Sequence, residues 1–230
     1  MVYVLEVRIL KEGDYKDKNL VAGIDEAGRG PVIGPLVIAG VMLRKSLIEN
    51  LRDMGVRDSK MLSSKRRVEL FDMIISLAES VVAVILPPRT IDFWVARHGL
   101  NKLEAKGVAK IIERFHVAEE IIIDSPSSAE KFRTYLHEFL GHDSGRIILE
   151  PKADRKYSIV GAASIIAKVI RDNEVRKIRD RLGIDFGSGY PSDPKTREAL
   201  RDIIQKDPTV VRRSWLTVKK MANRSLDEFL

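Results

Sequence analysis

Carboxylate side chains stand at the ends of three segments that read as buried strands. Asp25 and Glu26 follow the apolar run VAGI, Asp124 ends the run IIID, and Asp154 comes shortly after the run RIILE. Three strand ends of one sheet can meet at one edge, where carboxylates repel each other unless cations lie between them. Oxygen ligands without cysteine or a histidine pair favour Mg²⁺ or Mn²⁺ over zinc. The pattern therefore predicts a site for hard divalent cations.

A structural explanation competes for two of these acids. Capping alone would explain Asp124, which precedes a Ser-Pro step, and Asp154, which precedes a helix. The pair Asp25 and Glu26 is harder to explain in this way. Because neighbours on a regular strand point to opposite faces, there are two alternatives. Either the strand ends at Asp25 and the glycines turn Glu26 inward, or Glu26 contributes only its backbone carbonyl.

The segments that must position these acids read as alternating strands and helices. Apolar and β-branched runs predict five strands, at residues 20–25, 36–43, 81–86, 120–124 and 146–150. Apolar residues at helical spacing predict helices at residues 63–80, 100–115, 131–140 and 158–182, and another from about Lys195. This order indicates an α/β domain with a mixed sheet. We expect the domain to span residues 1–192, followed by a small helical extension at 193–230.

Composition excludes several classes of protein. The 230 residues are 44% hydrophobic and 32% charged, which argues against disorder. The absence of cysteine excludes disulfides, thiolate zinc sites and cysteine nucleophiles. The sequence has no Walker motif, no complete GxGxxG at the required spacing, and no apolar run near the ~20 residues that cross a bilayer. We expect a soluble, cytoplasmic protein and, since nothing suggests an obligate partner, a monomer.

The positive charge is concentrated in the last third of the chain. The formal net charge is +7, and residues 1–150 contain equal numbers of basic and acidic side chains, so residues 151–230 carry the whole excess. A basic region beside a neutral body suits a polyanionic partner, because cationic side chains displace counterions from phosphates. A solvated, salt-bridged helix surface explains the asymmetry equally well.

Five longer strings resemble the signature blocks of one enzyme family, ribonuclease HII in its archaeal form. They are GIDEAGRGPVIGPLVIAG, DSKMLSSKRR, IIIDSPSS, KADRKYSIVGAASIIAKVIRD and FGSGYPSDPKT, and they follow the family's order from about residue 20 to 200. The resemblance implies a ribonuclease H-like three-layer fold with a five-stranded mixed sheet. It implies an endonuclease that uses two divalent ions, Mg²⁺ or Mn²⁺, to cut the RNA strand of RNA–DNA hybrids and ribonucleotides embedded in duplex DNA. The expected products are a 3′-hydroxyl and a 5′-phosphate.

The resemblance also assigns the central residues of the site. The family's four catalytic, metal-binding acids fall on Asp25, Glu26, Asp124 and Asp154. Its Gly-Arg-Gly turn falls on residues 28–30, where a backbone without bulky side chains can approach a ribose 2′-hydroxyl. The turn thus comprises Gly28, Arg29 and Gly30.

Further substrate contacts are implied around this centre. The family's junction-sensing tyrosine falls on Tyr190, whose ring can stack on a sugar or base, although a core or loop tyrosine is the alternative. Lys60, Lys168 and Arg171 match basic positions suited to phosphate, whereas such residues on helices usually face solvent. Ser164 could donate a hydrogen bond to phosphate, or could serve close helix packing.

The C-terminal residues NRSLDEFL resemble the sequence that binds the sliding clamp, PCNA. Leu226 and Phe229 match its apolar positions, Asn223 replaces a glutamine, and Leu230 replaces the second aromatic residue. A helical turn with apolar side chains at i and i+3 suits docking into a pocket. An ordinary C-terminal turn packed on its own domain is the alternative.

Two other functions compete with the nuclease. A non-catalytic nucleic-acid-binding module would keep the basic surface without the chemistry, but all four acids are present. A sugar-kinase-like ATPase would also place acids and glycine turns at strand ends, and it would bind ATP.

Overall fold

A six-stranded mixed sheet forms the centre of the computed structural model, which describes residues 3–8, 19–56, 62–126, 128–141 and 146–227. The strands are arranged in the order β1-β4-β3-β2-β5-β6. Neighbours from β1 to β2 are antiparallel, and β2, β5 and β6 run parallel. Their bounds are Tyr3–Arg8, Leu20–Ala27, Leu36–Arg44, Ser80–Leu86, Glu120–Asp124 and Arg146–Glu150 for β1 to β6.

All five predicted strands are present, and β1 adds a sixth. β1 pairs with β4 at one edge of the sheet, at the register Tyr3 to Ile85. The fold class is therefore confirmed, with one strand more than the expected five. The segment YVLEVR is rich in strand-forming residues. Its place in the sheet depends on β4, about 80 residues away, and no local pattern shows that pairing.

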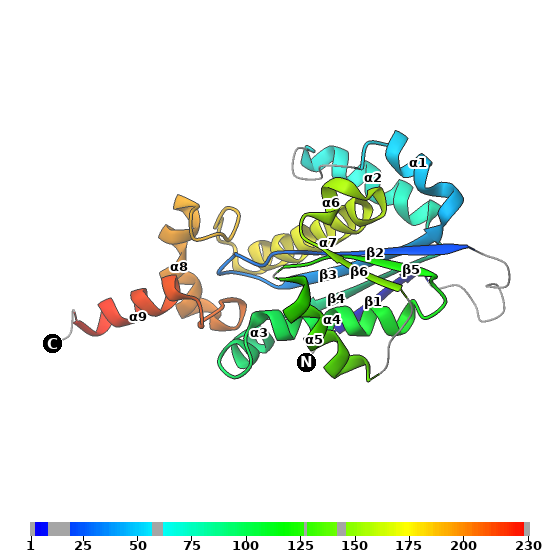
Figure 1. Cartoon of the computed structure of the whole chain (residues 1–230). Helices are drawn as coiled ribbons and strands as arrows, with labels where there is room; N and C mark the ends of the chain where they lie inside the picture. Colours follow the sequence, from blue (N-terminus) through cyan, green and yellow to red (C-terminus); the bar gives the residue numbers. More distant parts are fainter. Residues whose placement is uncertain (1–2, 9–18, 57–61, 127, 142–145, 228–230) are drawn as a thin grey trace.

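Helices cover both faces of the sheet and make the three layers. Figure 1 shows α1, α2, α6 and α7 on one face and α3, α4 and α5 on the other. Their bounds are Ile48–Asp53 (α1), Ser64–Leu77 (α2), Pro88–Val95 (α3), Leu100–Arg114 (α4), Ala129–Leu140 (α5), Ala153–Lys156 (α6), Ser158–Leu182 (α7), Pro194–Lys206 (α8) and Leu216–Asp227 (α9). Two short 3₁₀ turns cover Lys45–Leu47 and Pro208–Val210.

Most predicted helices agree with the structure, and the differences have local causes. The helix predicted to reach residue 80 ends at Leu77, because Ala78 is extended and Ser80 already pairs with Met42 in the sheet. A proline pair follows the end of β4, and Pro88 starts α3, a helix that the sequence did not predict. Proline suits a first helical position, where its missing N–H has no partner to lose.

The long helix α7 is pressed against the strand that carries the first acids. A Cβ atom on Gly23 in β2 would lie 2.5 Å from the backbone carbonyl of Ile159, so only glycine permits this approach. The first half of α7, from Ser158 to Ala167, is buried throughout. The small residues of this half therefore let the helix lie directly on the sheet beside the end of β2.

The predicted C-terminal extension packs on the rest of the chain through a third apolar cluster. Leu200 and Ile203 of α8 pack with Phe186 and with Val32 and Ile33 from the turn between β2 and β3. Figure 1 shows α8 and α9 at one end of the molecule, beyond the end of α7. The division into 1–192 and 193–230 remains a prediction. Within the described residues, no helix is both long and apolar enough to cross a membrane.

Candidate active site

Asp25 and Asp124 lie side by side because of the register of two parallel strands. β2 and β5 pair with Ile24 opposite Ile123, so the next residue of each strand is an aspartate. Side chains alternate along β5, and Ile122 belongs to the cluster beneath α7. Asp124 is two residues after Ile122, so its side chain points to the α7 face. Asp25 is two residues before Ala27, which belongs to the same cluster, so its side chain points to that face as well.

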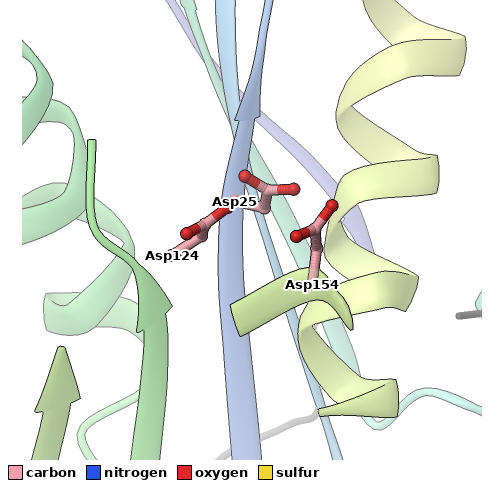
Figure 2. Close-up of side chains that lie close together, drawn as sticks. All are labelled: Asp25, Asp124 and Asp154. Carbon is pink, nitrogen blue, oxygen red and sulfur yellow. The ribbon is translucent and has the colours of Figure 1, made fainter. Parts of the chain in front are cut away.

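Asp154 completes a cluster of three carboxylates. It lies in α6, directly after β6, and one ligand oxygen from each of Asp25, Asp124 and Asp154 lies within 4.8 Å of the others. Figure 2 shows the three side chains turned toward one another from β2, β5 and α6. The backbone N–H of Ala153 donates to Asp124 Oδ1 at 3.3 Å, so Asp124 also holds the start of α6. The N-cap residues of α5, α6 and α7 are Ser128, Lys152 and Tyr157, so neither Asp124 nor Asp154 is the local helix cap that the alternative required.

The electrostatics of this cluster favour a bound cation. Burial raises the pKa of Asp25 well above its usual value, and the nearby charges of Glu26 and Asp124 raise it further. Hydrogen bonds from the Ser164 hydroxyl and the Glu26 N–H lower it again, the latter with N···O 2.7 Å. Three carboxylates with only oxygen donors suit a hard divalent cation, which would offset their repulsion. The residues present therefore fit a divalent metal.

Glu26 stands apart from these three side chains. β2 continues through Ala27, so the alternative in which the strand ends at Asp25 is wrong. Alternation along β2 places Glu26 with Ala22 and Ile24, which pack on the α4 face. Glu26 is half-buried and lines the same cleft as Asp25, but the three-carboxylate cluster does not include it.

A cleft of about 490 Å³ opens beside the acids and gathers most of the predicted residues. Among the described residues its basic side chains are Arg29, Arg67, Lys168 and Arg171, and the acidic Asp172 also lines it. The other lining residues are Asp25, Glu26, Ala27, Gly28, Gly30, Asp124, Ser164 and Tyr190. Lys60 lies outside the described residues. Arg67 and Asp172 are the two charged lining residues that sequence reasoning missed, although Arg67 belongs to the basic run KRR.

The Gly-Arg-Gly turn has a backbone that requires glycine. Gly28 has a φ of 90°, and a Cβ there would lie 2.8 Å from the carbonyl oxygen of Pro35. A Cβ on Gly30 would lie 3.2 Å from the ring of Tyr190, so the turn and this ring are close neighbours. The Arg29 side chain pairs with Glu104 of α4 at 2.8 Å. The backbone of the turn is thus the part best placed to meet a ligand.

The loop that carries Tyr190 is held against this turn. The N–H of Val32 donates to the carbonyl of Gly189 at 2.8 Å, and Arg171 Nη2 donates to the carbonyl of Ser188 at 2.9 Å. The Arg171 guanidinium lies 5.5 Å from the centre of the Tyr190 ring, which is 38% exposed. Tyr190 is therefore presented to the cleft, whereas Arg171 is mostly buried and supports the loop.

The predicted phosphate contacts differ in their surroundings. Ser164 is buried and hydrogen-bonded to Asp25, so its hydroxyl contacts an acid of the cluster. Lys168, one turn further along α7, is less buried and lines the cleft. The two residues share a helix face, which places a hydroxyl and an ammonium group along one wall of the site.

Three clustered carboxylates, two of them buried and one half-buried, lie beside a cleft lined by basic side chains and glycine backbone. Such a site in an α/β fold is typical of a metal-dependent protein that binds a phosphate-bearing ligand. A family model, Ribonuclease HII, matches residues 22–218. Ribonuclease HII of Pyrococcus abyssi is 44% identical over 222 residues, which cover 91% of this chain and 97% of the relative. The chain belongs to the ribonuclease HII family.

Solved structures agree with this assignment. The crystal structure of ribonuclease H2 from Pyrococcus horikoshii OT3 matches with a TM-score of 0.78 and 41% identity, over 89% of this chain and 98% of that one. The ribonuclease HII of Archaeoglobus fulgidus, solved as a complex with PCNA, matches with a TM-score of 0.76 and 43% identity, over 85% and 95% of the two chains.

Proposed function

We propose that this protein is an endonuclease that hydrolyses the RNA strand of RNA–DNA hybrids and cuts at ribonucleotides embedded in duplex DNA. The observation that carries the proposal is one shared cleft. The carboxylates of Asp25 and Asp124, the Gly-Arg-Gly turn and the Tyr190 ring all line it, and Asp154 completes the acidic cluster. Groups suited to hold cations and groups suited to recognise a ribose thus line the same cleft.

The acidic cluster would hold Mg²⁺ or Mn²⁺. Asp25, Asp124 and Asp154 would supply side-chain oxygens, and Glu26 would supply its backbone carbonyl. A pair of bound cations would activate water for attack on the scissile phosphorus and stabilise the leaving 3′-oxygen, which gives 3′-hydroxyl and 5′-phosphate ends. Ser164 orients the Asp25 carboxylate through its hydrogen bond.

The other residues of the cleft would bind and orient the nucleic acid. Lys168 and Arg67 would contact phosphates, as would Lys60, while Arg171 supports the loop of Tyr190. The backbone of residues 28–30 would read the 2′-hydroxyl, which distinguishes RNA from DNA at a site. The Tyr190 ring would stack on the neighbouring sugar or base.

Cleavage mapping on a duplex with one ribonucleotide tests this proposal. We expect a single cut at the ribonucleotide with Mg²⁺ or Mn²⁺, no cut with chelator, and no cut in an all-DNA duplex of the same sequence. Asp25→Asn should fold and lose metal-dependent cutting, whereas Asp72→Asn, an exposed substitution in α2, should not. Equal cutting of both duplexes, or a near wild-type rate for Asp25→Asn, would contradict the assignment.

We also propose that the C-terminal residues 223–230 bind a sliding clamp. The support is the resemblance of Leu226 and Phe229 to the clamp-binding sequence, together with the Archaeoglobus fulgidus relative solved with PCNA. Leu226 lies within α9, while Phe229 and Leu230 lie outside the described residues.

Two substitutions in this tail distinguish clamp binding from packing of the tail on its own domain. Phe229→Ala should abolish pull-down by the clamp and leave hybrid cutting intact, while Glu228→Gln, at a position without an apolar role in the motif, should retain pull-down. Retained clamp binding by Phe229→Ala would refute this role, and a lower melting temperature would instead support packing of the tail on its own domain.

A further inference from the structure

Arg212, which is about 180 residues further along the chain, forms hydrogen bonds to the backbone of the Gly-Arg-Gly turn. The side chain of Arg212 is fully buried, and its guanidinium donates to the backbone carbonyls of Gly28 at 2.6 Å, Arg29 at 3.1 Å and Gly34 at 3.0 Å. The backbone N–H of Arg212 donates to the carbonyl of Val32 at 2.8 Å. A single arginine therefore satisfies four carbonyls of the segment 28–34.

Neighbouring contacts keep this arginine in place. Trp215 Nε1 donates to the carbonyl of Gly30 at 3.2 Å, and the Arg212 guanidinium lies 5.0 Å from the centre of the Trp215 ring. Asp92 of α3 accepts the backbone N–H of Ser214 at 2.9 Å and so fixes the segment that carries both residues. The planar fork of arginine can serve several carbonyls at once, which the single ammonium centre of lysine cannot do.

The direction of these carbonyls sets the direction of the neighbouring amides. In a trans peptide the C=O of one residue and the N–H of the next point to opposite sides. Because the carbonyls of Gly28 and Arg29 point to Arg212, the N–H groups of Arg29 and Gly30 point away from it. Gly28, Arg29 and Gly30 all line the cleft, and the Arg29 side chain is engaged by Glu104, so the backbone of the turn is left to meet a ligand.

We propose that Arg212 is a positioning residue that aims the N–H groups of Arg29 and Gly30 at the 2′-hydroxyl of the ribonucleotide. This inference rests on the proposed function, in which residues 28–30 read that hydroxyl. Arg212 itself touches no reacting atom, so it acts on the choice between ribose and deoxyribose. Loss of its guanidinium should have little effect on the contacts of Lys168 and Arg67 with phosphates, because duplexes with ribose and with deoxyribose have the same phosphates.

The test measures two dissociation constants by fluorescence anisotropy, with Ca²⁺ in place of Mg²⁺. The probes are a duplex with one ribonucleotide and an all-DNA duplex of the same sequence, and their ratio is the ribose preference. We expect Arg212→Met to reduce this preference about tenfold, the equivalent of roughly 1.4 kcal/mol, with all-DNA affinity within about twofold of wild type. Arg213→Met removes the same charge from the exposed neighbouring residue and should keep the wild-type preference.

The outcomes separate this inference from the function on which it rests. If the wild type shows no ribose preference, both the 2′-hydroxyl readout and the role of Arg212 are refuted. If the wild type prefers the ribonucleotide and folded Arg212→Met does so equally, the readout stands and Arg212 has no part in it. Should Arg212→Met fail to fold, Arg212→Lys decides, because it keeps the charge without the fork. A reduced preference in that variant supports the proposal, and an unchanged one overturns it.

Discussion

Glu104 is a buried acid whose charge is costly to the fold. It lies in α4 with 2% of its surface exposed, and its Oε2 pairs with Arg29 at 2.8 Å, while its buried Oε1 has no hydrogen-bond partner within the described part of the chain. Burial raises the pKa of Glu104 from 4.5 to about 7, although the charges of Arg29 and Arg212 act in the opposite direction. We predict that Glu104→Gln removes a pH-dependent loss of stability.

The raised pKa gives the sign and the size of this effect. An acid that binds its proton more tightly in the folded state favours folding at low pH. That contribution is lost as the pH rises from the unfolded value of 4.5 through the folded value of about 7. One pKa unit corresponds to about 1.36 kcal/mol, so the wild type loses about 3 kcal/mol from Glu104 by pH 8. Glutamine resembles the protonated acid and has no such loss.

Urea unfolding of both proteins at several pH values between 5 and 8 measures this difference. The free energy of unfolding of Glu104→Gln relative to wild type should rise by about 2–3 kcal/mol across that range. Glu113→Gln, an exposed substitution on the same helix, should give a curve parallel to that of the wild type. If the stability of Glu104→Gln followed the same pH dependence as the wild type, the raised pKa of Glu104 in the folded state would be refuted.

Two glycine substitutions test the backbone of the site. Gly28→Ala adds a Cβ at a φ of 90° and 2.8 Å from the Pro35 carbonyl, so it should lower both cleavage and stability. It should cost at least ~1 kcal/mol more than Gly183→Ala, which has a φ of 63° and open space. Equal unfolding energies would contradict the overlap. Gly23→Ala should separate β2 from α7, lowering stability by roughly 1–3 kcal/mol and the affinity for Mn²⁺ in calorimetry. Unchanged metal affinity would show that this packing does not place Asp25.

The candidate acids could be selected from local pattern, whereas the family resemblance was needed to group them into one site. Asp25 and Asp124 end apolar runs, and parallel strands bring such ends to one edge of a sheet. Their common face also follows from alternation, given the register. The position of Glu26 could be stated only as two alternatives, because the sequence does not show whether the strand ends at Asp25 or continues to Ala27.

The support behind the site was not predictable from local pattern. Arg212 and Arg213 are adjacent in VVRRSW, yet one is fully buried and the other exposed, and the partners of Arg212 lie about 180 residues earlier. Glu104 sits in the polar-looking run LNKLEAKG, where a glutamate ordinarily faces solvent. Both side chains are buried because tertiary contacts supply charges and carbonyls that no sequence window contains.

The C-terminal extension supports the structure of the site in addition to carrying the proposed clamp-binding residues. Four carbonyls of residues 28–34 would lose their donors without Arg212, and an unsatisfied buried carbonyl costs about 1–3 kcal/mol. Val32 and Ile33 would also lose the apolar partners in α8 against which they pack. The turn proposed to read the substrate is therefore built jointly by the start and the end of the chain. Its shape depends on the extension even though every acid of the cluster comes from residues before 155.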